Sequence, residues 1–150
     1  MERTLILAKP DALQRALVGE IVSRFERRGL RIVGMKLMRV STALAQEHYK
    51  EHAGKPFFKG LVDYITTCPI VAMVVEGPRA IEIARASIGA TNPAQAAPGS
   101  IRGDLGVSIG RNLVHGSDSV ESAQREVALF FKPDELLDYA RATDPWILEL

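Results

Sequence analysis

Short apolar segments alternate with longer amphipathic segments along this chain, and this order restricts the fold more than any other feature of the sequence. Residues 4–8 and 70–76 are predominantly apolar runs of the length typical of buried strands, and residues 30–40 alternate apolar and charged side chains as a half-buried strand does. The apolar run 127–131 is expected to be the fourth and last strand. The short final connection favours an antiparallel or mixed sheet over a doubly wound one, so the pattern predicts an α/β sandwich.

Helical periodicity occupies most of the segments between these strands. Apolar residues recur at helical spacing between residues 18 and 28, and Gly29 supplies the left-handed residue that commonly ends a helix. Asp118 and Glu121 have the spacing of a capping box, which predicts that a helix starts just after residue 118. Four more helices are expected over residues 41–52, 57–65, 78–89 and 132–140. The first is capped by Ser41 or Thr42, the third starts at Pro78, and the fourth opens with Lys132-Pro133-Asp134.

The size and composition of the chain are those of one ordinary globular domain. Its 150 residues are 47% hydrophobic and 25% charged, and they contain no linker or repeat, so a single domain over residues 1–150 is expected. The net charge of +1 argues against a nucleic acid as a specific partner. Apolar runs are too short for a membrane span or a signal peptide, so we expect a cytoplasmic protein without a membrane partner. Cys68 is the single cysteine of the sequence, which excludes a disulfide framework, and it is expected to be a buried thiol.

His115 is the most informative of the three histidines. It lies near the end of a glycine- and proline-rich stretch, residues 89–116, that is longer than most loops in compact domains, and such loops are usually functional. Small polar residues follow it, so both a hydrogen-bonded loop histidine and a catalytic histidine fit this context. An imidazole that attacks phosphorus needs its second nitrogen held, usually by a carboxylate, and Glu126 is the candidate because it lies on the helix that follows.

Several cationic side chains are candidates for binding polyphosphate. Guanidinium groups match phosphate oxygens two at a time, although each of these residues, taken alone, also fits a solvated surface position. The glycine patterns of P-loop and dinucleotide-binding sites are missing, so a bound nucleotide would be held by side chains. The cations are Lys9, which ends the first strand, Arg85 on a helix, and Arg102 and Arg111 in the long loop.

Two pairs of residues in the region 48–57 have both a functional and an ordinary interpretation. Tyr49 and Phe57 can offer a stacking face to a nucleobase or simply pack in the core. His48 and His52 stand at the i, i+4 spacing that suits zinc, but the segment lacks the H-E-x-x-H pattern, and no third histidine or cysteine is near. A metal site is therefore not expected there.

Three motifs together resemble the nucleoside diphosphate kinase family. They are Lys9-Pro10-Asp11, Arg102-Gly103-Asp104 and the highly specific N-x-x-H-G-S-D-S string of residues 112–119, and the resemblance extends over residues 2–149. It implies a ferredoxin-like α+β sandwich with a four-stranded antiparallel sheet covered by helices. It also implies an enzyme that transfers the γ-phosphate of a nucleoside triphosphate to a nucleoside diphosphate by a ping-pong mechanism. A non-catalytic regulatory or binding member of the same fold is the alternative.

The resemblance also implies a role for individual residues. His115 would be the nucleophile that becomes phosphorylated, and Glu126 would orient its ring with support from Tyr49 and Ser117. The implied ligands of the phosphates and sugar are Lys9, Arg85, Thr91, Arg102 and Asn112, and those of the base are Phe57, Leu61 and Ile109.

The resemblance further implies a cofactor and an assembly. Mg²⁺ would be held through the nucleotide phosphates, with no direct protein ligand. The C-terminal residues 144–148 carry large apolar groups that would be exposed unless another subunit covered them, and relatives with such a tail are usually hexamers. A homohexamer is therefore expected, with a homotetramer as the alternative.

Overall fold

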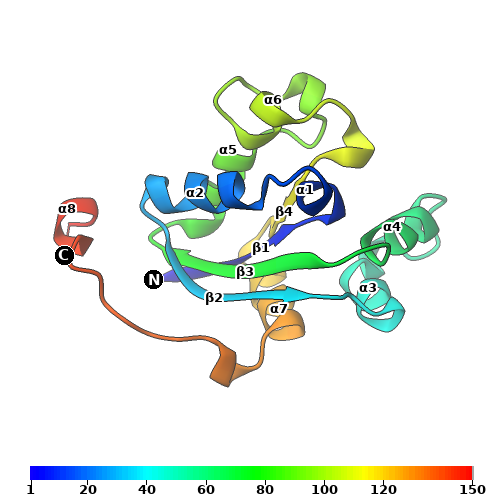
Figure 1. Cartoon of the computed structure of the whole chain (residues 1–150). Coiled ribbons are helices and arrows are strands. Elements are labelled where there is room, and N and C mark those ends of the chain that lie inside the picture. The colour runs from blue at the N-terminus through cyan, green and yellow to red at the C-terminus, as the bar shows by residue number, and fades with distance from the viewer. Residues whose placement is uncertain (150) are drawn as a thin grey trace.

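A four-stranded antiparallel sheet forms the centre of the computed structural model, which describes residues 1–149 (Figure 1). The strand order is β2-β3-β1-β4, and every neighbouring pair is antiparallel. The two central strands are buried on both faces, which explains why their sequences are almost continuously apolar. The strands are β1 (Glu2–Ala8), β2 (Arg31–Met38), β3 (Ile70–Gly77) and β4 (Val114–Gly116).

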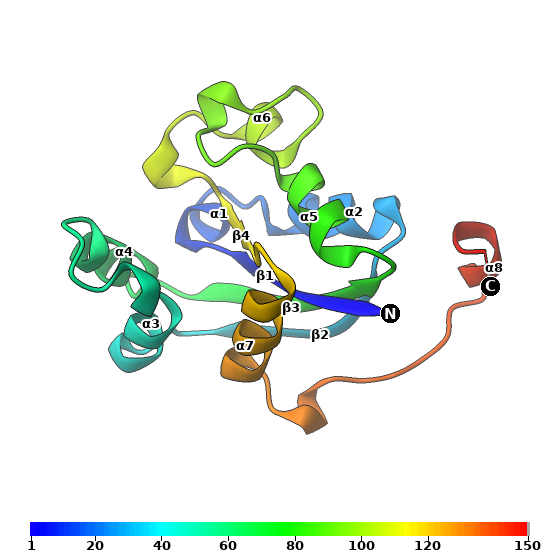
Figure 2. The same ribbon diagram turned by 180° about the vertical axis from the view of Figure 1, so that it is seen from behind.

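Helices cover both faces of this sheet (Figure 2). Because side chains alternate along a strand, Ile6 and Ala8 of β1 pack into one core layer, while Leu5 and Leu7 pack into the other. The first layer lies under α1 (Pro10–Gln14), α2 (Val18–Arg28) and α5 (Ala80–Ile88). The second lies under α3 (Thr42–His48), α4 (Phe58–Ile65) and α7 (Val120–Phe130).

The long stretch between α5 and β4 is ordered by short helical turns. It contains η2 (Pro93–Gln95), α6 (Ile101–Leu105) and η3 (Ile109–Arg111). Side chains of Asn92 and Ser100 cap two of these turns by accepting hydrogen bonds from backbone N–H groups. The prediction of irregular structure there is thus only partly right, because the segment is a chain of turns packed beside α1 and α5 (Figure 2).

The predicted strand 127–131 is wrong, because Val127–Phe130 form the last turn of α7. Ser119, rather than Asp118, caps this helix, accepting a hydrogen bond from the Ser122 N–H at 3.1 Å. Ala123, Val127 and Phe130 repeat at helical spacing, and Val127 and Phe130 pack in the second core layer. A short apolar run fits a helix or a strand equally well from its own sequence, and here the cap and the buried face decide for the helix. The fourth strand is instead β4, which has three residues and no detectable period.

The predicted helix 132–140 is also wrong. Only η4 (Pro133–Glu135) is helical, and the chain then runs extended beside β2, where the Leu137 N–H donates to the Val33 carbonyl at 2.8 Å. Other bounds differ more modestly. The helix expected over 41–52 ends at His48 and continues as η1 (Lys50–His52), the helix expected from Pro78 begins at Ala80, and α1 was not predicted.

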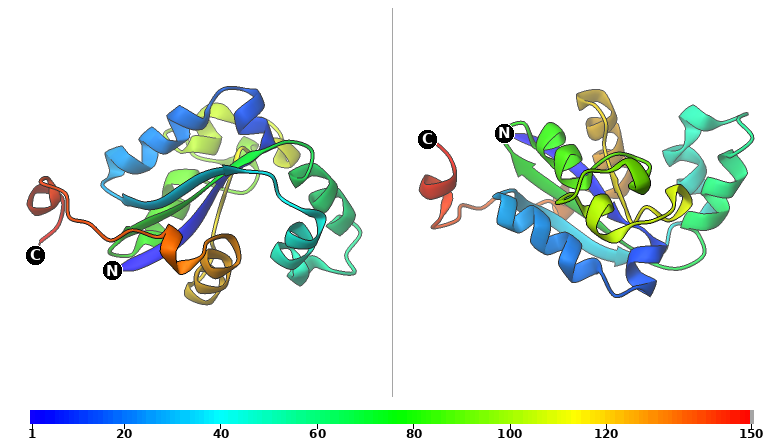
Figure 3. Two further views of the ribbon diagram at one scale, coloured as in Figure 1. Left: turned by 60° about the horizontal axis from the view of Figure 1, so that its bottom comes forward. Right: turned by 90° about the horizontal axis from the view of Figure 1, so that it is seen from above.

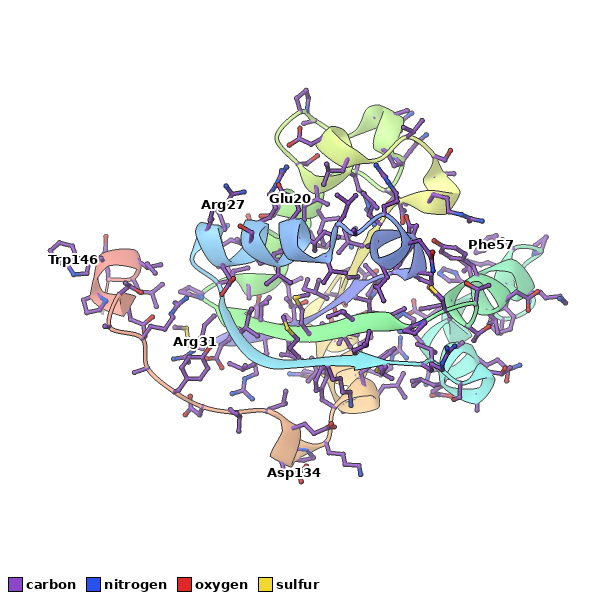
Figure 4. All side chains as sticks on the ribbon, in the orientation of Figure 1. Glu20, Arg27, Arg31, Phe57, Asp134 and Trp146 are labelled. Carbon is purple, nitrogen blue, oxygen red and sulfur yellow. The ribbon has the colours of Figure 1, made fainter. Side chains whose placement is uncertain are left out.

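The C-terminal segment leaves the body of the protein and ends in α8 (Asp144–Ile147) (Figure 3). Trp146, labelled in Figure 4, is 90% exposed, in line with the expectation that apolar groups here have no cover within one chain. Arg141 anchors the segment by donating to the Gly29 carbonyl at 3.0 Å. Within residues 1–149, no helix is long and apolar enough to cross a membrane. Cys68 is half-buried rather than fully buried.

Candidate active site

One pocket of about 790 Å³ collects almost all of the residues that the sequence singled out. It lies where the ends of β1 and β4 meet the helical hairpin α3–α4, α5 and the turns of residues 89–112. Ser117 alone among the candidates does not line it and is fully buried behind Glu126. The lining candidates are Lys9, Tyr49, Phe57, Leu61, Arg85, Thr91, Arg102, Ile109, Asn112, His115 and Glu126.

His115 is held by a carboxylate, as an imidazole that attacks phosphorus would need to be. Its Nε2 lies 2.7 Å from Oε1 of Glu126, and the Ser117 hydroxyl donates to the same oxygen at 2.8 Å. Burial alone would raise the pKa of Glu126, but the hydrogen bonds and charge of His115 outweigh it and hold this pKa below its usual value. The carboxylate therefore stays ionised, and Nε2 is the nitrogen that carries the proton. Within residues 1–149, Nδ1 forms no hydrogen bond, and its ring is 24% exposed and lines the pocket.

Two further rings pack around this pair. His48 stands edge-on to His115, with ring centroids 4.8 Å apart, and Tyr49 stands edge-on to His48 at 4.6 Å. Burial, and secondarily the charge of Glu126, raises the pKa of Tyr49 to about 12, so its hydroxyl keeps its proton. Tyr49 thus lines the pocket beside the histidine, as the resemblance implies. The placement of His48 was not anticipated from the sequence, where only its spacing from His52 stood out.

Lys9 projects from the end of β1 into a network that reaches the loop. Its ammonium group donates to the Asn112 side-chain oxygen at 2.6 Å, and the Asn112 amide donates to the Thr91 carbonyl at 3.0 Å. Burial, reinforced by the positive charges of Arg102 and Arg111 and opposed by the charge of Asp11, lowers the pKa of Lys9 to about 8. An anion in the pocket would restore full protonation of this lysine.

Arg102 is almost completely buried, although it carries a charge. Its guanidinium nitrogens donate to the carbonyls of Gly89, Asn112 and Val114, at 3.2, 3.1 and 2.6 Å. Burial and the nearby Arg85 lower its pKa to about 10. Arg102 therefore pins the loop to β4 and at the same time brings positive charge to the pocket.

Arg85 reaches the same region from α5. Its guanidinium donates to the Gly116 carbonyl at 3.0 Å, directly beside His115. Arg111 lies over the Tyr64 ring, 4.2 Å from its centroid. Four cations thus converge on one pocket from distant parts of the chain, which is the arrangement that a polyphosphate needs.

Asp11 is a buried structural residue of this site that the sequence analysis quoted only as part of a motif. Its Oδ2 accepts a hydrogen bond from the Leu113 N–H at 3.0 Å, and the Lys9 N–H donates to the Leu113 carbonyl at 2.9 Å. Leu113 has φ +72°, a left-handed conformation that costs free energy for a leucine. The two bonds hold this strained residue, which sets the positions of Asn112 on one side and His115 on the other.

An apolar face closes the outer side of the pocket. Phe57, at the start of α4 (Figure 4), is 52% exposed, and Ile109 on the opposite loop is 59% exposed. Leu61 lies one turn after Phe57 and lines the same space. Exposed apolar side chains that line a pocket are well placed to pack on a flat aromatic ligand. His52 lies close by, with its ring 5.2 Å from that of Phe57.

The chain is similar to a large set of known proteins. A family model described as nucleoside diphosphate kinase matches residues 2–136. The nucleoside diphosphate kinases of Desulforamulus reducens and Chloroflexus aurantiacus are 59% and 61% identical, and each match covers 99% of this chain and 100% of the relative.

Solved structures agree with this similarity. A nucleoside diphosphate kinase family protein from Babesia bovis superposes with a TM-score of 0.96 at 47% identity, covering 99% of this chain and 100% of the other. A halophilic nucleoside diphosphate kinase from Halobacterium salinarum, solved in complex with CDP, superposes with a TM-score of 0.96 at 51% identity and covers 99% of both chains. The ferredoxin-like antiparallel fold is confirmed, and the chain belongs to the nucleoside diphosphate kinase family.

Proposed function

We propose that this enzyme moves a terminal phosphate from a nucleoside triphosphate to a nucleoside diphosphate through a covalent phosphate on Nδ1 of His115. The observation that carries this proposal is the 2.7 Å contact between Nε2 of His115 and Glu126, because it commits one nitrogen to the carboxylate and leaves the other as the nucleophile. Glu126 and Ser117 orient the ring, and Tyr49 supports it from the pocket side. The family membership of the chain makes it a phosphotransferase of this kind.

The reaction takes two balanced half-steps. Nδ1 of His115 forms a bond to the γ-phosphorus as the bond from that phosphorus to the bridging oxygen breaks, and the nucleoside diphosphate leaves with the bond electrons. A second diphosphate then attacks the phosphohistidine in the reverse sense and restores the neutral ring. The positive charge that the phosphorylated imidazole carries is balanced by the carboxylate of Glu126, and Ser117 keeps that carboxylate in place.

The cations stabilise the transferring group. In phosphoryl transfer, negative charge spreads over the phosphoryl oxygens, so fixed positive groups lower the barrier. Lys9, Arg85 and Arg102 are placed for this by backbone and side-chain hydrogen bonds and need little reorganisation when the nucleotide binds. Thr91 and Asn112 complete the implied set of phosphate and sugar ligands from the same wall of the pocket.

Mg²⁺ fits this pocket as a partner of the nucleotide. It prefers oxygen ligands, keeps several waters and is commonly bound by substrate phosphates together with one or two carboxylates. Among the pocket-lining carboxylates of residues 1–149, Glu126 is engaged by His115 and Ser117. Arg125 engages Glu51, which leaves the exposed Asp118. When bound, the ion would neutralise phosphate charge, and phosphate oxygens would be its main ligands.

The base is proposed to stack on Phe57, with Leu61 and Ile109 on its other sides. The CDP complex of the Halobacterium salinarum enzyme supports a nucleoside diphosphate as a ligand of this chain. Stacking depends little on the identity of the base, so we expect purine and pyrimidine nucleotides to be used side by side.

Labelling with radioactive ATP tests the proposal. The protein should acquire a label that is lost in acid and survives base, as a phosphohistidine does, and should pass it to added nucleoside diphosphate. The His115→Ala variant should lose both the label and the transfer, while His52→Ala, a matched change of a pocket-lining histidine 5.2 Å from Phe57, should keep both. Labelling of the His115→Ala variant at the normal level would refute the proposal.

The assembly and the location of the protein are two further parts of the proposal. We propose a single domain over residues 1–150 that forms a homohexamer, with a homotetramer as the alternative, because the Trp146 side chain is 90% exposed. Light scattering on the purified protein separates these masses. A cytoplasmic location agrees with a nucleotide substrate and is tested by fractionation.

A further inference from the structure

His48 is a buried histidine whose two ring nitrogens have no partner. It is 4% exposed, and neither Nδ1 nor Nε2 forms a hydrogen bond within the part of the chain that the structure describes. Its ring is surrounded by the rings of Tyr49, His115 and Phe130, all edge-on. A buried polar group without a partner costs free energy, so this position calls for a ligand or a function.

The nitrogens of His48 lie next to two other metal-binding groups. His48, His115 and Glu126 each offer one ligand atom, and these atoms lie within 4.8 Å of one another. Ligand atoms around a tetrahedral zinc ion stand about 3.3 Å apart, so small side-chain movements would bring these three atoms to the spacing that zinc needs. The spacing of His48 from His52, which first suggested zinc, does not make this site. The partner that the fold supplies is His115, from a distant strand.

We propose that His48, His115 and Glu126 form a binding site for a divalent transition-metal ion, Zn²⁺ in particular, when no nucleotide is bound. Two imidazoles and one carboxylate are ligands that such ions prefer, whereas Mg²⁺ favours oxygen alone. The pocket is open at His115, so water can fill the fourth position. The Ser117 hydroxyl, 2.8 Å from Glu126, supplies the outer hydrogen bond that usually orients a ligating carboxylate.

Charged groups around the three ligands limit the affinity of the site for a cation. The positive charges of Lys9 and of Arg125, whose guanidinium lies 3.8 Å from Glu126, oppose a cation. The site should therefore be weaker than a closed structural zinc site.

Metal binding has a consequence for the reaction, and this consequence, unlike the binding itself, rests on the proposed function. The nitrogen of His115 that faces Glu126 is Nε2, so a cation between them replaces their shared proton, which is released to water. The ion then draws electron density from the ring and shifts it from its place. Zn²⁺ should inhibit formation of the phosphohistidine.

The binding is measured on the full-length protein without nucleotide. A chromophoric chelator in competition reports Zn²⁺ affinity, and Co²⁺ in place of Zn²⁺ reports the ligand geometry through its visible absorption bands. We expect one ion per chain, with an affinity that falls at least about tenfold in His48→Asn and in Glu126→Gln and is unchanged in His52→Asn. Circular dichroism confirms that each variant is folded, and Glu126→Gln serves if His48→Asn is not.

Each result has a definite meaning. Wild-type protein that takes up no Zn²⁺, or a folded His48→Asn variant that binds it as tightly as wild type, overturns the metal site. The inhibition arm follows phosphohistidine formation from Mg-ATP with and without Zn²⁺. A wild-type protein that forms no phosphohistidine even without Zn²⁺ counts against the proposed function, whereas the binding result stands by itself.

Discussion

Replacing Glu126 with glutamine removes one negative charge from the site and keeps the shape of the side chain. In the native protein the Glu126 Oε1 atom interacts with His115 Nε2 at 2.7 Å and accepts a hydrogen bond from Ser117 at 2.8 Å, and the residue is only 5% exposed. The amide oxygen of glutamine can accept both bonds, so the fold should survive. What changes is the strength of the interaction with the imidazole, which becomes cationic when it is phosphorylated.

The size of the effect follows from the two kinds of hydrogen bond. A bond to a charged group contributes about 1.5–3 kcal/mol and a neutral one about 1 kcal/mol, so the substitution costs about 1–2 kcal/mol. His115 is partly exposed to solvent, so the free-energy cost of the substitution stays within this range and does not reach the larger cost expected in a dry interior. The rate of phosphohistidine formation should therefore fall about 5- to 30-fold.

Rapid-quench measurement of a single turnover with labelled ATP isolates this step from product release. Ser117→Ala is a matched control that leaves the carboxylate charged and should cost less. A Glu126→Gln variant whose phosphorylation rate lies within twofold of wild type would refute the assignment of Glu126 as the group that balances the imidazole.

The same variant tests the pH dependence of stability. The pKa of Glu126 is lower in the folded protein than its usual value, so its contribution to stability is present above the usual glutamate pKa and is lost as the pH falls through the folded value. Urea unfolding over this acidic range should show a smaller pH dependence in Glu126→Gln than in wild type. An identical pH dependence would show that folding does not lower the pKa of Glu126.

Three further predictions concern the walls of the pocket. Because the pKa of Lys9 is lowered to about 8, the free enzyme loses this positive charge as the pH rises through 8. The affinity for ADP, measured by calorimetry, should weaken over this range and should be weak at every pH in Lys9→Met. A wild-type affinity that does not change with pH would contradict this. Asp11→Ala leaves the buried Leu113 N–H unpaired and should lower the unfolding free energy by about 1–3 kcal/mol. Asp11→Asn keeps an acceptor and should lower it less. Equal losses of unfolding free energy in the two variants would show that this hydrogen bond is unimportant. Phe57→Ala should raise the KM of purine and pyrimidine diphosphates alike by about 5-fold or more, because stacking contributes about 1–3 kcal/mol. The melting temperature should not change, because this side chain is half exposed. An effect on one base only would argue for specific recognition of that base.

Local sequence was sufficient where an element carries its own period or cap. The helix over Val18–Arg28 was predicted at its observed bounds because its apolar face and Gly29, with φ +101°, mark it independently of any neighbour. The strands β1 and β3 were found because a strand buried on both faces is apolar throughout. The specificity of the N-x-x-H-G-S-D-S string singled out His115 for the same reason, since all of its information is contiguous.

Local sequence failed where packing chose between two acceptable conformations. Val127–Phe130 has the composition of a strand, yet Ser119 starts a helix that continues through it. The segment after Glu135 has helical composition and instead lies extended along the edge of β2, since backbone hydrogen bonding to Val33 was available there. The three-residue strand β4 is too short to show a period.

The sequence by itself determined the family and the histidine at the centre of the site, because a contiguous motif specifies both. Most of the other residues of the site lie outside this motif. The sequence did not determine where these residues meet. Antiparallel pairing of Leu7 with His115 places the end of β1 beside the proposed nucleophile, which brings Lys9 to the pocket, and α7 returns Glu126 to the ring. The same packing set His48, rather than His52, next to His115. These are contacts between segments far apart in the chain, and only the closure of the sheet and its helical layers supplies the free energy that holds them together.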